Sequence, residues 1–170
     1  LGDIHKWGLP GGLPDSVKGR SERIWALLNC VRSGGPSIDI FAELLSLDKV
    51  GIATVSKWVC LLDQKKYAIF DSRVSVAVRE VRVGGLRVLP LFPRRKKRDH
   101  TPWPADAFSR TTRAVSMASY YMRYLDLMSD AARILKIKPA GVEMALFMLG
   151  DMTCTDPATW RRTRGELKSV

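Results

Sequence analysis

The feature that most constrains the fold of this chain is a four-residue interruption between two amphipathic helical segments. Asp48-Lys49-Val50-Gly51 breaks an apolar pattern of helical spacing, which predicts two helices joined by a tight hairpin. Gly51 is expected to supply backbone angles or a close approach that a side chain would block, and Val50 to pack between the helices. The pattern consists of Ile38, Phe41, Leu44, Leu45 and Leu47 before the break, then Val55, Val59 and Leu62 with Ile52, Trp58 and Leu61 beside them.

This hairpin would open the N-terminus of the second helix. The backbone N–H groups there are free, and the helix dipole adds partial positive charge, so anions bind well at such an end. Lys49 and Lys57 flank it. The sequence therefore predicts a seat for a phosphate group at the hairpin.

An extended link and a third helix follow. Lys65-Lys66-Tyr67-Ala68-Ile69-Phe70 is short and rich in aromatic and β-branched residues, which favours an extended segment. Asp71 comes directly after it, where its carboxylate can cap the N–H groups of the next helix. An N-cap is the plain structural interpretation of this residue. The third helix is predicted from Val74, Val76, Val78 and Val81, before Gly84-Gly85.

Together these parts resemble a known family. LDKVGIATVSKWVCLLDQKKYAIFDSRVSVAV is similar to the helix-hairpin-helix core of the DNA base-excision glycosylases, including the 8-oxoguanine and endonuclease III branches. In that family a Leu-Pro-Gly-Val-Gly hairpin and a following Thr lead, about one helix later, to a hydrophobic-Asp motif. The resemblance implies an aspartate that caps a helix and also faces the sugar of a flipped nucleotide. The matching residues are Leu47, Val50, Gly51 and Thr54 in the hairpin and Phe70-Asp71 in the aspartate motif.

Two departures from the family pattern bear on the chemistry. Asp48-Lys49 stands where the family has Pro-Gly, so the hairpin is expected to be less tight or to bind phosphate less well. Ala53 stands where bifunctional members carry the lysine that forms a Schiff base, which implies a monofunctional enzyme that uses water. Lys57 lies one helical turn beyond Ala53, so a displaced lysine is an alternative; a solvated surface charge is the plain interpretation.

Composition limits the possible classes. At 170 residues and 46% hydrophobic composition the chain can bury the core of one domain, residues 1–170, and its net charge of +11 favours a polyanionic partner or an acidic membrane surface. No stretch reaches the ~18 apolar residues of a membrane-spanning helix. Three widely spaced cysteines indicate a reducing, intracellular compartment and argue against a disulfide scaffold or a Cys-rich metal site. An iron–sulfur loop of four cysteines cannot be built, and we expect no metal or cofactor.

The N-terminal part is predicted to hold a loop or arm over residues 1–19 and a helix over residues 21–31. Ser33-Gly34-Gly35-Pro36 ends that helix, and Ser37 is a suitable N-cap for the next one. The hairpin core then spans residues 36–83. Residues 86–92 are predicted to form a hydrophobic loop or short edge strand because they contain Pro90.

A basic run follows the core, and it has two interpretations. It can track phosphates on nucleic acid, with Trp103 stacking on a base, or it can be a solvated surface loop. The run consists of Arg94, Arg95, Lys96, Lys97 and Arg98.

The C-terminal part is predicted to add a helical layer over residues 104–150. A long helix over residues 105–137 carries one apolar stripe, and a second helix from Pro139 is expected to stop at Gly150. A last basic helix is predicted to begin at Asp156-Pro157. The fold class is therefore all-α, a compact helical bundle around a central helix-hairpin-helix motif. The stripe consists of Val115, Ala118, Tyr121, Met122, Leu125, Met128, Ala132 and Leu135.

The functional hypothesis is a monofunctional DNA glycosylase acting on double-stranded DNA, with Asp71 stabilising the sugar cation as a damaged or modified base leaves. A non-catalytic helix-hairpin-helix DNA-binding module, in which Asp71 only caps, is the alternative. An unrelated basic helical protein that binds RNA or protein is a third hypothesis. Trp58, Tyr67, Phe70 and Trp103 are candidate stacking partners for a base, with core packing as the alternative for each. The residues expected to contact DNA are Lys49, Val50, Gly51, Thr54, Arg73, Arg94, Arg95, Lys96, Lys97, Arg98 and Trp103.

Overall fold

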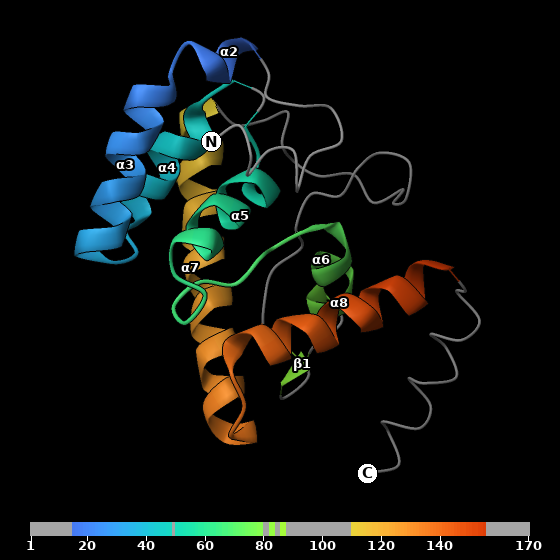
Figure 1. Cartoon of the computed structure of the whole chain (residues 1–170). Coiled ribbons are helices and arrows are strands. Elements are labelled where there is room, and N and C mark those ends of the chain that lie inside the picture. Colours follow the sequence, from blue (N-terminus) through green and yellow to red (C-terminus); the bar gives the residue numbers. More distant parts are fainter. Residues whose placement is uncertain (1–14, 49, 80–81, 84–85, 88–109, 156–170) are drawn as a thin grey trace, which may run out of the picture.

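The computed structural model describes residues 15–48, 50–79, 82–83, 86–87 and 110–155 of the chain (Figure 1). The predicted all-α architecture is confirmed; among the described residues the exception is a short ladder, in which Arg82 pairs with Arg87 and Val83 with Leu86. The elements are α2 (Asp15–Lys18), α3 (Ser21–Gly34), α4 (Ile38–Ser46), α5 (Ile52–Leu62), α6 (Ser72–Arg79), β1 (Arg82–Val83), β2 (Leu86–Arg87), α7 (Arg110–Leu135) and α8 (Pro139–Thr155).

The predicted hairpin lies between α4 and α5. Val50 is buried at the turn, as expected, and α5 covers the predicted residues 52–62. The expectation for Gly51 is wrong. Its φ of −115° is an ordinary extended value, and a Cβ placed on it would meet no atom within 4 Å. The turn therefore needs neither the conformational freedom nor the small size of glycine at this position.

The N-terminal helices differ from the prediction at their ends. Within the part of the expected arm that the structure describes, α2 is helical and buries Val17. Helix α3 runs three residues beyond Val31 and ends before Gly35, whose φ of 83° lies in the left-handed region that favours glycine. Ser37 occupies the N-cap position of α4, but its side chain makes no capping hydrogen bond.

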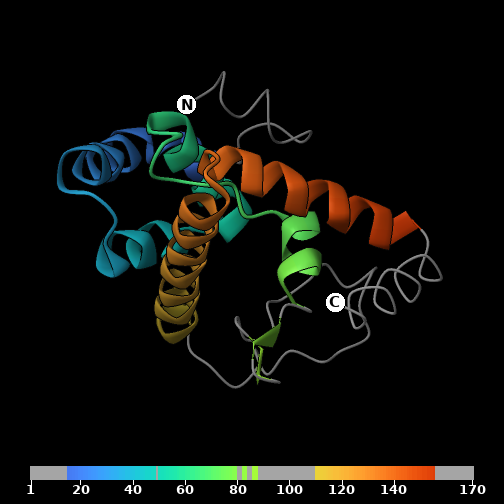
Figure 2. The ribbon, with the colours of Figure 1, turned by 90° about the horizontal axis from the view of Figure 1, so that it is seen from below.

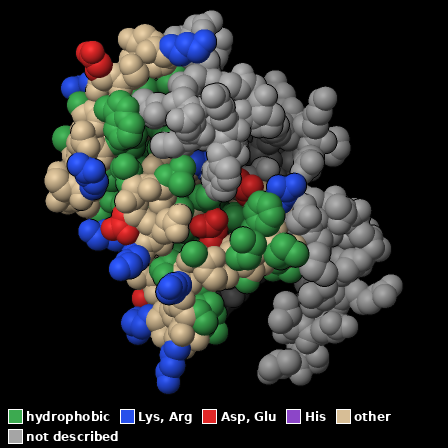
Figure 3. All heavy atoms as spheres, viewed as in Figure 1, with side chains coloured by type: hydrophobic (Ala, Val, Ile, Leu, Met, Phe, Trp, Pro, Cys, Tyr) green, Lys and Arg blue, Asp and Glu red, His purple; other side chains and the backbone are tan. Residues whose placement is uncertain are grey.

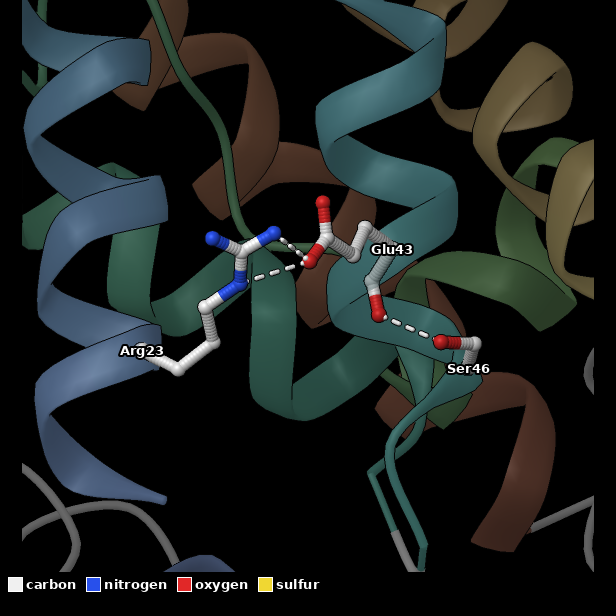
Figure 4. Close-up of polar contacts among 3 residues, drawn as sticks. All are labelled: Arg23, Glu43 and Ser46. Atoms are coloured by element: carbon white, nitrogen blue, oxygen red, sulfur yellow. Dashed lines mark hydrogen bonds and ion pairs between the residues drawn. The ribbon is translucent and has the colours of Figure 1, made fainter.

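An ion pair connects α3 to α4 on the surface (Figure 4). The Arg23 guanidinium donates two hydrogen bonds to Oε1 of Glu43, one of them from Nε at 2.8 Å. The Ser46 hydroxyl donates a hydrogen bond to the Glu43 carbonyl oxygen at 2.7 Å. Both charged side chains remain exposed, so the pair contributes little to stability.

Helix α7 packs along α4 and supplies one side of the core. The predicted stripe is correct in its middle but wrong at Val115 and Leu135, which are 43% and 60% exposed. Tyr120 and Tyr124 are buried in addition to the predicted Tyr121. The buried face of α7 consists of Ala114, Ala118, Tyr120, Tyr121, Tyr124, Leu125, Met128 and Ala132.

The described part of α8 does not stop at Gly150, contrary to the prediction; the helix continues to Thr155. Figures 1 and 2 show α8 crossing the lower end of α7 and running beside α6. At Gly150 the two helices touch by their backbones, because a Cβ there would lie 2.0 Å from the carbonyl oxygen of Arg73. The lack of a side chain at Gly150 thus allows α6 and α8 to approach closely, and it does not end the helix.

Candidate active site

Asp71 caps helix α6, as the sequence predicts. Its Oδ1 accepts hydrogen bonds from the backbone N–H groups of Arg73 at 2.8 Å and Val74 at 3.0 Å. The side chain is partly exposed, and Oδ2 makes no hydrogen bond to any residue that the structure describes. One carboxylate oxygen therefore fixes the helix while the other is available to a ligand.

Residues 67–70, which lie outside any helix or strand, lead to Asp71, and we call them the linking segment. The prediction of an extended segment from Lys65 is wrong at its start, because Lys65 and Lys66 lie in a turn in which the Asp63 carbonyl accepts the N–H groups of Lys66 and Tyr67.

Two tyrosines of α7 donate to carbonyl groups of the linking segment: Tyr121 to Ala68 and Tyr124 to Ile69, each at 2.8 Å. Burial raises the pKa of the Tyr124 hydroxyl, as do the charges of Glu143 and Asp71. The phenol therefore stays a hydrogen-bond donor at neutral pH.

The N–H groups of the linking segment are also fixed. Phe70 N–H donates to Oγ of Ser56 on α5 at 3.0 Å, and Ile69 N–H donates to Oε2 of Glu143 on α8 at 2.8 Å. Three helices, α5, α7 and α8, thus hold the backbone directly before Asp71. Buried backbone groups paired in this way restrict the position of the following residue.

The aromatic side chains near the site belong to the core. Phe70 packs edge-on against Tyr120 and Tyr124, with ring centroids 5.8 and 4.8 Å apart. Trp58, Tyr67 and Phe70, three of the candidate stacking partners, are each 2% exposed or less. Core packing, the alternative for these three residues, is the role that the structure gives them.

Glu143 is a residue of this site that the sequence reasoning missed. Burial raises the pKa of its carboxyl group; the hydrogen bond from Ile69 opposes that rise, and the charge of Asp71 adds to it. Two carboxyl groups therefore lie close enough to influence one another. The available signal was the spacing of Glu143, Phe147 and Gly150, which places all three on one face of α8.

The other members of that face contact Arg73. Its guanidinium carbon lies 4.7 Å from the centroid of the Phe147 ring, a cation–π contact, and its carbonyl oxygen faces Gly150. The side chain of Arg73 is half-buried. Helix α8 therefore holds the first turn of α6 beside the linking segment.

The hairpin residues lie at the start of α5. Thr54 is only 8% exposed, and its N–H already donates to the Gly51 carbonyl at 2.9 Å. The N–H groups of Gly51, Ile52 and Ala53 donate to no described residue, so these amides, with the buried Val50 behind them, are the ones that can face a phosphate.

Of the remaining residues predicted for the site, the structure describes Lys57, and the others lie outside the described residues. Lys57 is half-buried on α5, next to Ser56, whose hydroxyl contacts the linking segment. Through Ser56, α5 therefore contacts Phe70, the residue directly before Asp71. Outside the described residues lie Lys49, Arg94, Arg95, Lys96, Lys97, Arg98 and Trp103, as does the predicted basic helix after residue 156.

Hydrophobic and basic side chains occupy different parts of the surface seen in Figure 3. In Figure 3 hydrophobic side chains gather along α8, and Lys and Arg side chains lie over the lower end of α7.

A hollow of about 260 Å³ opens beside Lys65, Lys66 and Ala68, but Asp71 does not line it. This hollow is therefore not a base pocket facing the cap. No helix in the described part of the chain is long and apolar enough to span a membrane.

Comparisons with known proteins place the chain in a family. A family model described as "Putative 8-oxoguanine DNA glycosylase OGG-like protein" matches residues 15–147, which include the hairpin, the linking segment, Asp71 and Glu143. No curated protein and no solved structure gives a significant match. Because the family model covers most of the chain, the protein belongs to this OGG-like family.

Proposed function

We propose that the protein is a monofunctional DNA glycosylase that removes a damaged or modified base from double-stranded DNA inside the cell. The observation that carries the proposal is the Asp71 carboxylate, which uses one oxygen to cap α6 and keeps the other available. Membership of the OGG-like family supports DNA as the substrate. The net charge of +11 favours the same partner.

The mechanism follows from the geometry of the cap. When the bond between base and sugar breaks, positive charge develops on the sugar. A carboxylate held beside it lowers the energy of that state, because its position is fixed before the reaction begins. The same carboxylate can orient the attacking water. The linking segment supplies the fixed position, since its peptide groups are bonded to α5, α7 and α8.

The hairpin supplies the DNA contact in this proposal. The amides of Gly51, Ile52 and Ala53 open α5 and carry the partial positive charge of a helix N-terminus, so one phosphate oxygen can accept hydrogen bonds there. The base leaves its stack and is excised in the flipped state. Affinity should fall steeply with added salt, as it does when phosphates carry the binding.

Asp71→Asn tests the catalytic role. Asparagine is as good an N-cap as aspartate, so α6 and the fold should persist. The loss of the negative charge should lower the single-turnover excision rate by about 10²–10³-fold. The measurement uses duplex oligonucleotides carrying 8-oxoguanine, other oxidised purines or modified pyrimidines, with DNA affinity measured in parallel.

The matched control is Asp63→Asn. Asp63 also accepts a backbone hydrogen bond, from Lys65 N–H at 2.9 Å, but it follows α5 and does not cap α6. This control should leave excision unchanged. If Asp71→Asn excises as fast as the wild type, Asp71 is only a cap. If the wild type binds DNA but removes no base in the panel, the protein is the non-catalytic DNA-binding module instead.

A separate experiment tests the absence of a Schiff base. Ala53 stands at the family's lysine position, so excision should leave an intact abasic site, and borohydride should trap no covalent complex. A trapped complex that disappears in Lys57→Gln would show that Lys57 takes over the lysine role.

A further inference from the structure

A second carboxylate contacts the segment that carries Asp71. Glu143 accepts the Ile69 N–H at 2.8 Å, across 74 residues of sequence. Ile69 precedes Asp71 by two residues, and two residues of chain span at most about 7 Å. Glu143 therefore fixes the backbone one short step before the cap.

The chemistry of this contact differs from that of its neighbours. Among the residues that the structure describes, hydroxyl groups of Ser56, Tyr121 and Tyr124 also make side-chain hydrogen bonds to the backbone of the linking segment. A carboxylate acceptor makes a shorter and stronger bond than a neutral one. The burial that raises the pKa of Glu143 makes its charged form costly, and the nearby charge of Asp71 adds to that cost. Perturbed carboxyl groups of this kind cluster at functional sites.

We propose that Glu143 is a positioning residue for Asp71: by holding the Ile69 N–H, it fixes the linking segment so that the Asp71 carboxylate meets the sugar of the flipped nucleotide. This inference rests on the proposed glycosylase function. It assigns α8 a part in the site that the hairpin and aspartate motif do not contain. Phe147 and Gly150 assist from the same helix through their contacts with Arg73.

Two substitutions separate the hydrogen bond from the charge. Glu143→Gln keeps an oxygen that can accept the Ile69 N–H, whereas Glu143→Leu removes the acceptor. We expect Glu143→Leu to lower the single-turnover excision rate about 10²-fold with little change in DNA affinity, because a misplacement of about 1 Å costs that much. Glu143→Gln should stay within about tenfold of the wild type. Glu43→Gln, at the exposed ion pair with Arg23, is the surface control and should change nothing.

Hydrogen exchange gives an independent readout. The Ile69 amide should be protected in the wild type and in Glu143→Gln, and should exchange faster in Glu143→Leu while α3 amides stay protected. Equal rate losses in Glu143→Gln and Glu143→Leu would overturn the positioning role, as would an unimpaired Glu143→Leu. If Glu143→Leu does not fold, the Gln variant still decides. If the wild type excises no base, the proposed function fails, and unchanged Ile69 exchange in Glu143→Leu would separately refute the contact.

Discussion

The close approach of α6 and α8 makes Gly150→Ala the most informative substitution for the fold. The new Cβ would lie 2.0 Å from the Arg73 carbonyl oxygen, whereas ordinary contacts begin near 3.4 Å. The helices must therefore separate by about 1.4 Å at this point, the difference between those two distances. The atom in the way belongs to the backbone of a capped helix, so it cannot rotate aside as a side chain would.

Gly141→Ala on the same helix is the control. Its Cβ would meet the side chain of Ile137, with Cδ1 nearest at 3.4 Å, and Ile137 is 47% exposed. Both substitutions gain helix propensity, which by itself stabilises a helix interior by up to about 1 kcal/mol. Gly141→Ala should therefore be as stable as the wild type or more so. Gly150→Ala should be about 1–3 kcal/mol less stable than Gly141→Ala because of overpacking.

Urea unfolding followed by circular dichroism measures both variants. The expected result is a lower midpoint for Gly150→Ala with an unchanged slope. If the protein excises a base, Gly150→Ala should also lose excision rate, because the displaced Arg73 lies in the turn that Asp71 caps. Equal stability of the two variants would refute the close approach of α6 and α8, and with it the role of α8 in placing the cap.

Three further predictions use buried groups. Ser56→Ala should destabilise the fold by about 1–3 kcal/mol because the Phe70 N–H loses its acceptor. Ser75→Ala should be neutral or stabilising because Ser75 Oγ has no hydrogen-bond partner in the described structure. Chemical denaturation compares the stabilities of the two variants. Burial, with a smaller effect of the Glu143 charge, raises the pKa of the Cys60 thiol to about 11. In Cys154→Ser at pH 8 the exposed Cys30 should therefore react with a thiol reagent at least about tenfold faster than the buried Cys60, and two equally fast thiols would contradict this. Burial in the folded state raises the pKa of Glu143 above its ordinary value of 4.5, so the contribution of this group to stability is present below pH 4.5 and is lost as pH rises. The wild type should therefore lose stability relative to Glu143→Gln as the pH increases from 4.5, and a constant difference in urea midpoints would count against this.

The local elements of the site could be predicted from the sequence. The hairpin, helix α5, a non-helical link before Asp71 and the capping position of Asp71 follow from short-range patterns of apolar, turn and capping residues. Each depends on neighbours within one or two turns of chain. Gly51 was the exception, because a glycine at a turn does not reveal whether its special backbone angles are used.

The tertiary contacts could not be predicted in the same way. Local signals favour a stop at Gly150, but the approach of α6 leaves no room for a side chain there, and the helix continues. Tyr124 is buried although the expected stripe does not include it. Its hydroxyl donates a hydrogen bond to the carbonyl of Ile69, 55 residues away in the sequence. Glu143 resembles any surface glutamate until Ile69 is placed beside it. These assignments need the relative positions of helices, which no periodicity contains.

The bond between Ile69 and Glu143 also has a consequence for how the protein matures on the ribosome. The 74 residues between them take roughly 4–15 s to synthesise at ordinary elongation rates. During that interval Glu143 has not yet been synthesised, so the amide of Ile69 lacks this acceptor. The contact between Glu143 and the linking segment is therefore completed late in translation, when α8 docks.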